Sequence, residues 1–213
     1  MTKVKICGIT NHEDLIASIE FGADYVGFIV DLPIVSHREI VPELANELVS
    51  ETPTGVATTM VTILEEVERT VDLFEQVGAD VLQIHGDFTI ELIEEISDMI
   101  DKKLVVSIDP KNEIVDQVAD IIDAIVCDSQ GERGAGGTGK TNDWDRVREL
   151  KKETKLPIIL AGGLTPENVS KAIDIVDPFA VDVSSGVEGP GGLKNHEAIR
   201  EFIRSAHKIG GGM

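Results

Sequence analysis

The chain is poor in aromatic residues, in basic residues and in cysteine. Its 213 residues include six Phe, one Tyr and one Trp, so Val, Ile, Leu and Ala must fill any core. The 19 Lys and Arg are outnumbered by 39 Asp and Glu, which makes binding to nucleic acid or to anionic membranes unfavourable. No apolar run approaches the roughly 18 residues of a membrane span, and no signal peptide is apparent. We therefore expect a soluble protein with one domain over residues 1–213.

The two cysteines and the charge balance also bear on the compartment. Cys7 and Cys127 lie inside apolar runs, without the spacing of a disulfide framework or a zinc site. No His, Asp or Glu spacing supports another metal site. We expect a cytoplasmic protein with neither metal nor cofactor. The excess of carboxylates is typical of proteins adapted to high salt, where screening relieves self-repulsion.

Short runs rich in Val and Ile recur along the chain, at 4–9, 25–30, 54–60, 81–86, 104–109, 124–129, 157–161 and 180–184. Segments with helical spacing of apolar residues separate them, as at Leu64, Val67, Val71 and Phe74. Asn11, Thr89 and Thr165 are typical of helix starts. Apolar strands alternating with helices predict a parallel sheet. Eight such units predict an α/β fold, a single (β/α)8 TIM barrel, and a doubly wound open sheet is the alternative.

Two side chains at strand ends have the chemistry of an acid and a base. In such a barrel the carboxyl ends of the strands form one mouth, where Cys7 and Asp128 would meet. A thiolate and a protonated carboxyl group on opposite sides of a sugar can isomerise it by moving protons. Each residue has a plainer interpretation: a buried cysteine packs like a small hydrophobe, and Asp128 can pair with Arg133.

Glycine and serine mark three candidate loops. Gly162 and Gly163 follow the seventh predicted strand and Ser184 and Ser185 the eighth, where barrels often bind phosphate through backbone N–H groups. Tight turns are the alternative for both. The run at 131–141 resembles a Walker loop, but its spacing after the strand fails. We interpret that run, with Gly136, Gly137 and Thr138, as an active-site loop over the mouth, or else as a plain flexible loop.

Arg38 is the only arginine among the first 68 residues. It follows the second predicted strand, near the expected mouth. A guanidinium group binds a carboxylate through two hydrogen bonds, so Arg38 is a candidate for holding a substrate carboxylate. A solvated surface charge is the alternative.

Five segments together resemble phosphoribosylanthranilate isomerase of tryptophan biosynthesis: KICGIT at 5–10, QIHG at 83–86, GGTGKTNDW at 136–144, AGGLTPENV at 161–169 and VDVSSGVE at 181–188. The resemblance implies a (β/α)8 barrel that converts N-(5-phosphoribosyl)anthranilate to 1-(2-carboxyphenylamino)-1-deoxyribulose 5-phosphate by an Amadori rearrangement, without a cofactor. It implies that Cys7 is the general base and Asp128 the general acid. It also implies that Arg38 holds the anthranilate carboxylate and that the Gly162–Gly163 and Ser184–Ser185 loops bind phosphate. The chain departs from the family around 31–35 and 57–61.

Two other functions remain as alternatives. The related isomerase of histidine biosynthesis does similar chemistry with two aspartates, and Cys7 argues against it. A barrel that only binds a phosphorylated metabolite and regulates a partner is disfavoured by the presence of both Cys7 and Asp128. The sequence leaves a monomer and a homodimer equally open.

Overall fold

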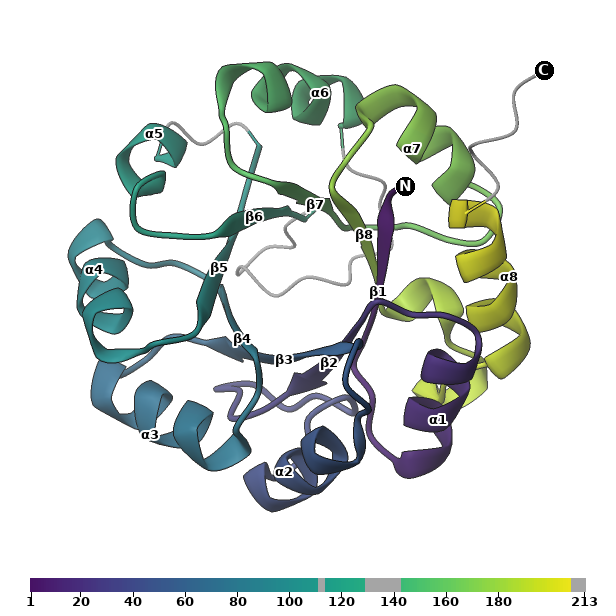
Figure 1. Ribbon diagram of the computed structural model, residues 1–213, viewed down its shortest axis with the longest axis horizontal. Helices are drawn as coiled ribbons and strands as arrows, with labels where there is room; N and C mark the ends of the chain where they lie inside the picture. The colour runs from purple at the N-terminus through teal and green to yellow at the C-terminus, as the bar shows by residue number, and fades with distance from the viewer. Residues whose placement is uncertain (111–113, 129–142, 208–213) are drawn as a thin grey trace.

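The computed structural model describes residues 1–110, 114–128 and 143–207. Eight strands, each parallel to its neighbours, form a closed barrel in chain order, and the first strand pairs with the last. Helices surround this ring on the outside (Figure 1). The predicted (β/α)8 barrel is therefore confirmed, and closure of the ring excludes the open doubly wound sheet. The predicted loop residues Gly136, Gly137 and Thr138 lie outside the described residues.

Strands and helices alternate along the chain. The first half contains β1 (Lys3–Cys7), α1 (His12–Glu20), β2 (Tyr25–Ile29), α2 (Pro42–Glu51), β3 (Ala57–Ile63), α3 (Val67–Val77), β4 (Val81–His85) and α4 (Ile90–Met99). The second half contains β5 (Lys103–Ile108), α5 (Val115–Val118), β6 (Ala124–Cys127), α6 (Trp144–Glu153), β7 (Ile158–Leu160), α7 (Val169–Val176), β8 (Ala180–Val183) and α8 (His196–His207). Two 3-10 turns, η1 (Ser185–Val187) and η2 (Pro190–Gly192), precede α8.

Most predicted boundaries agree with these bounds, and two do not. The third strand covers 57–63 rather than 54–60, because Pro53 to Gly55 form the turn before it. The helix expected to start after Thr165 begins at Val169. The side chain of Asn168 instead accepts a hydrogen bond from the Thr165 N–H. The caps at Asn11 and Thr89 are confirmed by their bonds to the amides of Asp14 and Leu92.

Strand residues alternate between two environments. One set faces outward and packs with the helices in the main apolar core, as Val4 and Ile6 of β1 do. The other set faces the inside of the barrel, where a smaller apolar cluster contains Val105, Ala124, Val126 and Ala161. The remaining inward positions include buried polar residues, among them Lys5, Gln83, Ser107 and Asp182. The barrel interior thus contains both apolar and polar buried residues.

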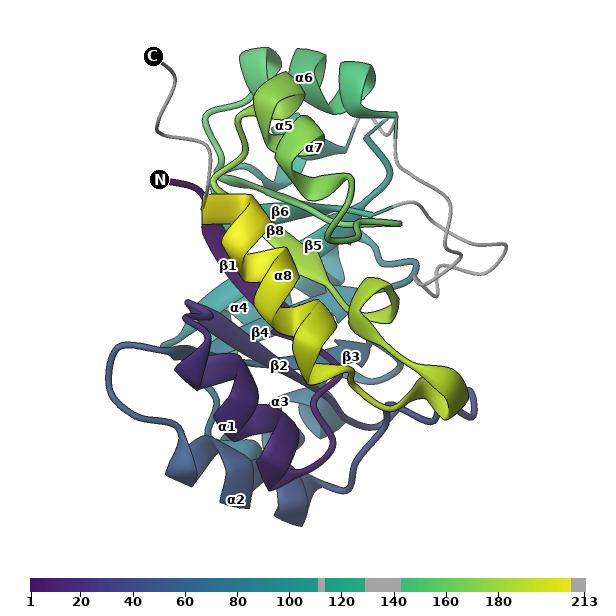
Figure 2. The ribbon, with the colours of Figure 1, turned by 90° about the vertical axis from the view of Figure 1, so that its right-hand side faces the viewer.

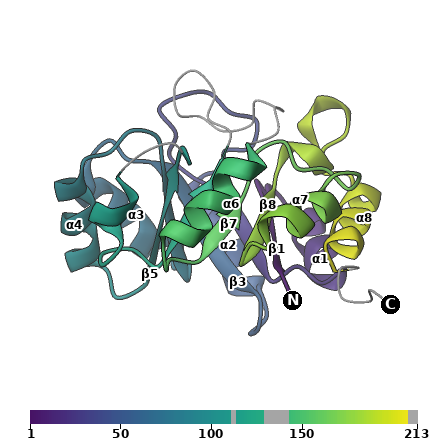
Figure 3. The same ribbon diagram turned by 90° about the horizontal axis from the view of Figure 1, so that it is seen from above.

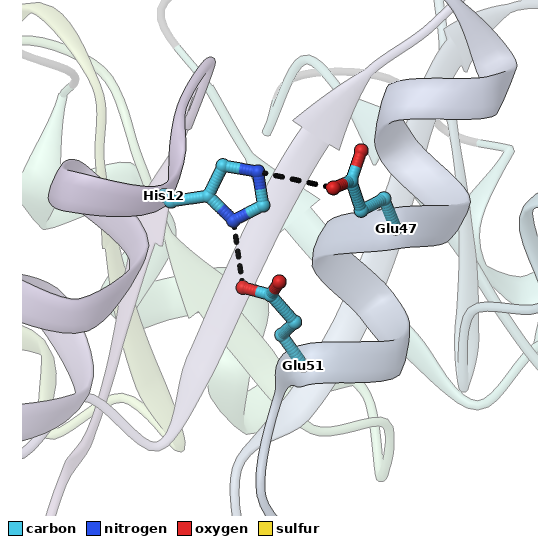
Figure 4. Close-up of side chains that lie close together, drawn as sticks. All are labelled: His12, Glu47 and Glu51. Atoms are coloured by element: carbon cyan, nitrogen blue, oxygen red, sulfur yellow. Dashed lines mark hydrogen bonds and ion pairs between the residues drawn. The ribbon is translucent and has the colours of Figure 1, made fainter.

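Helices α1 and α2 are joined by a polar contact at the surface. The imidazole of His12 lies between two glutamates of α2 (Figure 4), 2.6 Å from Glu51 and 3.5 Å from Glu47. The hydrogen bond that the His12 ring donates to the Glu51 carboxylate raises the pKa of His12. Each ring nitrogen faces a carboxylate, which is the arrangement of an ion pair. No helix among the described residues is both long and apolar enough to cross a membrane.

Candidate active site

A cavity of about 310 Å³ opens at the carboxyl ends of the strands. The loop between β2 and α2 and the segment after β8 rise at this end of the barrel (Figures 2 and 3). All of the predicted site residues that the structure describes line this cavity: Cys7, Arg38, Asp128, Gly162, Gly163, Ser184 and Ser185. The structure therefore brings together groups that are up to 178 positions apart in the sequence.

Cys7 is the last residue of β1 and faces the barrel interior. Its thiol occupies space that a glycine on the neighbouring strand leaves open. A Cβ atom on Gly27 would lie 2.8 Å from the Cys7 sulfur, closer than such atoms approach one another. Burial raises the pKa of the Cys7 thiol, and the nearby Lys5 ammonium opposes that effect. The site thus holds a buried thiol beside a fixed cation.

The second cysteine has a different environment although it also ends a strand. Cys127 faces outward and packs in the core between the sheet and the helices. Burial raises its pKa to about 12, so it stays a thiol at ordinary pH. Asp128 comes one residue later, and the alternation of the strand turns it inward to line the cavity. The thiol and the carboxyl group at the cavity therefore come from β1 and from the end of β6.

A polar network forms the floor below the thiol. The Lys5 ammonium donates to Oε1 of Gln83 at 2.7 Å and to Oδ2 of Asp182 at 2.8 Å. Gln83 in turn contacts Nε2 of His85 at 2.6 Å. Burial and the Lys5 charge lower the pKa of His85 to about 4, so the ring is neutral near pH 7. None of these four residues was assigned a role from the sequence, although each belongs to one of the segments that resemble the family.

Arg38 lies on the β2–α2 loop, which a bridge between Ile29 and Glu39 folds back toward the strands. Its guanidinium donates to both carboxylate oxygens of Glu188, with distances of 2.7 and 2.9 Å. Lys194 binds the same carboxylate at 3.0 Å. Burial would raise the pKa of Glu188, but Arg38 and Lys194 outweigh it and hold the pKa at about 2. Two cations share one anion, so this group carries a net positive charge in an acidic protein.

The loops after β7 and β8 are in direct contact. Gly162 and Gly163 have φ values of 84° and 63°, which favour glycine over any other residue. The side-chain amide of Asn168 donates to the Gly163 carbonyl at 2.9 Å and braces this loop. A side chain at Gly186 would clash with the carbonyl oxygen of Leu164, so a glycine is needed where the loops meet.

A lysine that the sequence analysis did not single out lies behind the second of these loops. The buried Lys194 ammonium donates to the carbonyl and hydroxyl oxygens of Ser184, at 3.1 and 3.3 Å. It therefore places a positive charge next to the loop expected to bind phosphate. The two glycines, the two serines and this lysine form a compact site suited to an anion.

Known proteins share the sequence and fold of the whole chain. The N-(5'-phosphoribosyl)anthranilate isomerase of Haloferax volcanii is 44% identical over 211 residues, covering 97% of this chain and 93% of the relative. The enzyme of that name from Halorubrum lacusprofundi is 43% identical over 210 residues, covering 97% of both chains. Both are halophilic relatives.

Solved structures agree with these relatives. The phosphoribosyl anthranilate isomerase of Thermotoga maritima superimposes with a TM-score of 0.83 at 40% identity, covering 97% of this chain and 98% of the other. A crystal structure of such an isomerase in complex with reduced 1-(o-carboxyphenylamino)-1-deoxyribulose 5-phosphate has a TM-score of 0.81 at 38% identity, with the same coverage. The profile of one family matches residues 4–205. The chain therefore belongs to the N-(5'-phosphoribosyl)anthranilate (PRA) isomerase family.

Proposed function

We infer that the chain converts N-(5-phosphoribosyl)anthranilate to 1-(2-carboxyphenylamino)-1-deoxyribulose 5-phosphate in tryptophan biosynthesis, with Cys7 as general base and Asp128 as general acid. Family membership and the bound product analogue of a structural neighbour support the reaction. One observation carries the residue roles: Cys7 and Asp128 line the same cavity as the candidate phosphate loops. An acid, a base and an anion site are the groups that this rearrangement needs.

The chemistry consists of proton transfers around one sugar. Asp128 protonates the ribose ring oxygen, and cleavage of the ring C–O bond gives an open-chain Schiff base. The Cys7 thiolate then removes the C2' proton, and the electron pair of that C–H bond forms the enolamine. Tautomerisation of the enolamine yields the ketone. Carbon C1 is reduced and C2 oxidised within the same molecule, so no external oxidant or reductant takes part.

The anthranilate end of the substrate would lie against the β2–α2 loop. Leu32, Ile34 and Val35 line the cavity there and offer apolar contacts to an aromatic ring. Nε and Nη2 of Arg38 donate to Glu188. Nη1 is then the nitrogen that would donate to the substrate carboxylate. We propose that Arg38 binds this carboxylate while Glu188 holds its orientation.

The phosphate end would lie at the loops after β7 and β8. Backbone N–H groups at Gly162, Gly163, Ser184 and Ser185 are the proposed donors, and the Lys194 ammonium behind them adds a favourable charge. The two ends of the substrate would thus bind on either side of the acid and the base. A reducing cytoplasm suits the two cysteines, which are not joined in a disulfide, and a monomer or a homodimer remains the proposal for the assembly.

Two substitutions test the acid and base roles. Cys7→Ser and Asp128→Asn should each lower kcat/KM by about 100-fold or more, because positioned acids and bases contribute on that scale. The assay follows the loss of fluorescence of freshly made phosphoribosylanthranilate. Cys127→Ala is the matched control, since it removes the thiol that faces away from the cavity, and its activity should match wild type. Wild-type turnover in either active-site variant would refute the role of that residue.

A further inference from the structure

Lys5 is a buried cation that the proposed acid and base do not account for. It lies two residues before Cys7 on β1, so its side chain shares the inner face of the strand one layer deeper in the barrel. Only 2% of the residue is exposed. It contacts the cavity through the groups above it, because the residues that line the cavity include Cys7, Gln83 and Asp182.

The lysine and the thiol flank the same small space. A Cβ atom on Gly27 would lie 2.8 Å from the Cys7 sulfur and 3.2 Å from Cε of Lys5. The missing side chain at Gly27 therefore lets the end of the lysine reach the thiol from below. An opposite charge at such range favours the ionised form of a titrating group.

The surroundings of Lys5 keep its ammonium group charged. Burial alone would lower the pKa of Lys5, but the Asp182 carboxylate at 2.8 Å and the Cys7 sulfur together more than offset burial, and the net pKa is raised. Gln83 adds a neutral acceptor at 2.7 Å. A buried ion pair adds little to stability because desolvation cancels much of the attraction. Stability is therefore a weak reason for placing this pair directly below a thiol.

We propose that Lys5 is a positioning residue whose ammonium group, fixed by Asp182 and Gln83, stabilises the thiolate form of Cys7 for proton abstraction. The proposal deepens the function above and rests on Cys7 being the base. The proton of the resting thiol leaves to solvent through the cavity, and Lys5 stays protonated throughout. Lys5 acts only through the sulfur and does not touch the substrate.

Other charged groups near Cys7 also affect the pKa of its thiol. Burial raises the pKa of the thiol most, Lys5 lowers it, Asp182 raises it and Lys194 lowers it. Arg38 lies on the cavity side and also interacts with the thiol. His85 is neutral, since its pKa is about 4. Lys5 lowers the pKa of the thiol more than Lys194 does, so we expect the largest change in that pKa when Lys5 is removed.

The test measures the thiol itself. In a Cys127→Ala background, the ionisation of Cys7 is followed by thiolate absorbance at 240 nm and by the rate of alkylation against pH. Lys5→Met should raise the pKa of Cys7 by about one unit or more, as the loss of a nearby opposite charge does. At neutral pH, kcat/KM should then fall about tenfold, with the rising limb of the pH profile moved to higher pH by the same shift. Lys3→Met is the matched control, at the partly exposed start of the same strand.

Lys5→Met leaves Asp182 buried without its partner, which can prevent folding, so a second pair of variants repeats the test without the Asp182 carboxylate. Asp182→Asn and Lys5→Met/Asp182→Asn are compared in the same way, and the double variant leaves no buried charge alone. The thiol pKa should be higher in the double variant than in Asp182→Asn. An equal thiol pKa in that comparison, or in folded Lys5→Met against wild type, would overturn the proposal.

The outcomes separate this proposal from the function on which it rests. If Cys7→Ser keeps full turnover, Cys7 is not the base and the catalytic part of the Lys5 proposal falls with it. If Cys7→Ser is inactive but removing Lys5 leaves the thiol pKa unchanged, only the Lys5 proposal fails.

Discussion

Gly27 shows how a single missing side chain shapes the site. Its position on β2 places it beside both the Cys7 sulfur and the end of the Lys5 chain. Any larger residue would displace one of them. The absence of a side chain at this position of the second strand therefore leaves the space that the Cys7 sulfur and the end of Lys5 occupy.

Arg38 and Glu188 act as one unit at the residue scale. Arg38→Ala should mainly raise KM, because a carboxylate clamp holds the substrate and the transition state alike. Glu188→Gln should raise KM in the same direction but by less, since it removes the charged half of the bidentate pair and leaves the guanidinium in place. Steady-state kinetics on the purified variants measure both effects.

Surface arginine Arg69 provides the control for this comparison. It pairs with Asp31 on the exterior, and Arg69→Ala should leave KM unchanged. An unchanged KM in Arg38→Ala would reject the clamp.

At the scale of elements, the His12 contact makes the packing of α1 on α2 depend on pH. The pKa of His12 is raised above the ordinary value of 6.5, so its stabilising effect is fully present below about pH 6.5 and is lost as pH rises through the higher folded value. His12→Asn should therefore lower the Tm at pH 6 and have little effect at pH 9. Thermal melts across this range measure the difference.

The control for His12 removes its partners instead. In a Glu47→Gln/Glu51→Gln background, His12→Asn should change the Tm by the same amount at pH 6 and at pH 9, because the two carboxylates that pair with the ring are gone. A Tm difference between wild type and His12→Asn that is equal at both pH values would contradict the ion-pair interpretation. Because the three side chains are exposed, the effect should be small.

At the scale of the molecule, the net charge of −20 opposes compaction at low salt. Molar KCl should therefore raise the Tm above its value in dilute buffer, because salt screens the repulsion. Exposed acidic side chains follow one face of α3 at Glu68, Asp72 and Glu75. The variant Glu68→Gln/Asp72→Asn/Glu75→Gln should show a smaller salt response than wild type. A Tm that is the same in dilute buffer and molar KCl would disprove salt dependence.

Local sequence signals were enough to predict the barrel and the residues at its mouth. Cys7, Asp128 and the Gly and Ser loops follow apolar strands, and strand ends must converge in a closed parallel barrel. The pairs Lys5–Asp182 and Arg38–Glu188 were not predicted. Each joins segments at least 150 positions apart, and residue spacing carries no information on which distant charges meet. The helix start at Val169 was missed because Asn168 bonds backward to the loop.

The pairing of β1 with β8 brings Cys7 of the first strand and Asp182 of the last strand to the same cavity. Cys7 and Lys5 are synthesised at the very beginning of the chain, whereas Asp182 arrives 177 residues after Lys5. A folding intermediate that lacks the final strand would contain the sulfur without the anion that secures its neighbouring cation. On the proposed role of Lys5, recovery of turnover during refolding should therefore follow the pairing of β8 with β1.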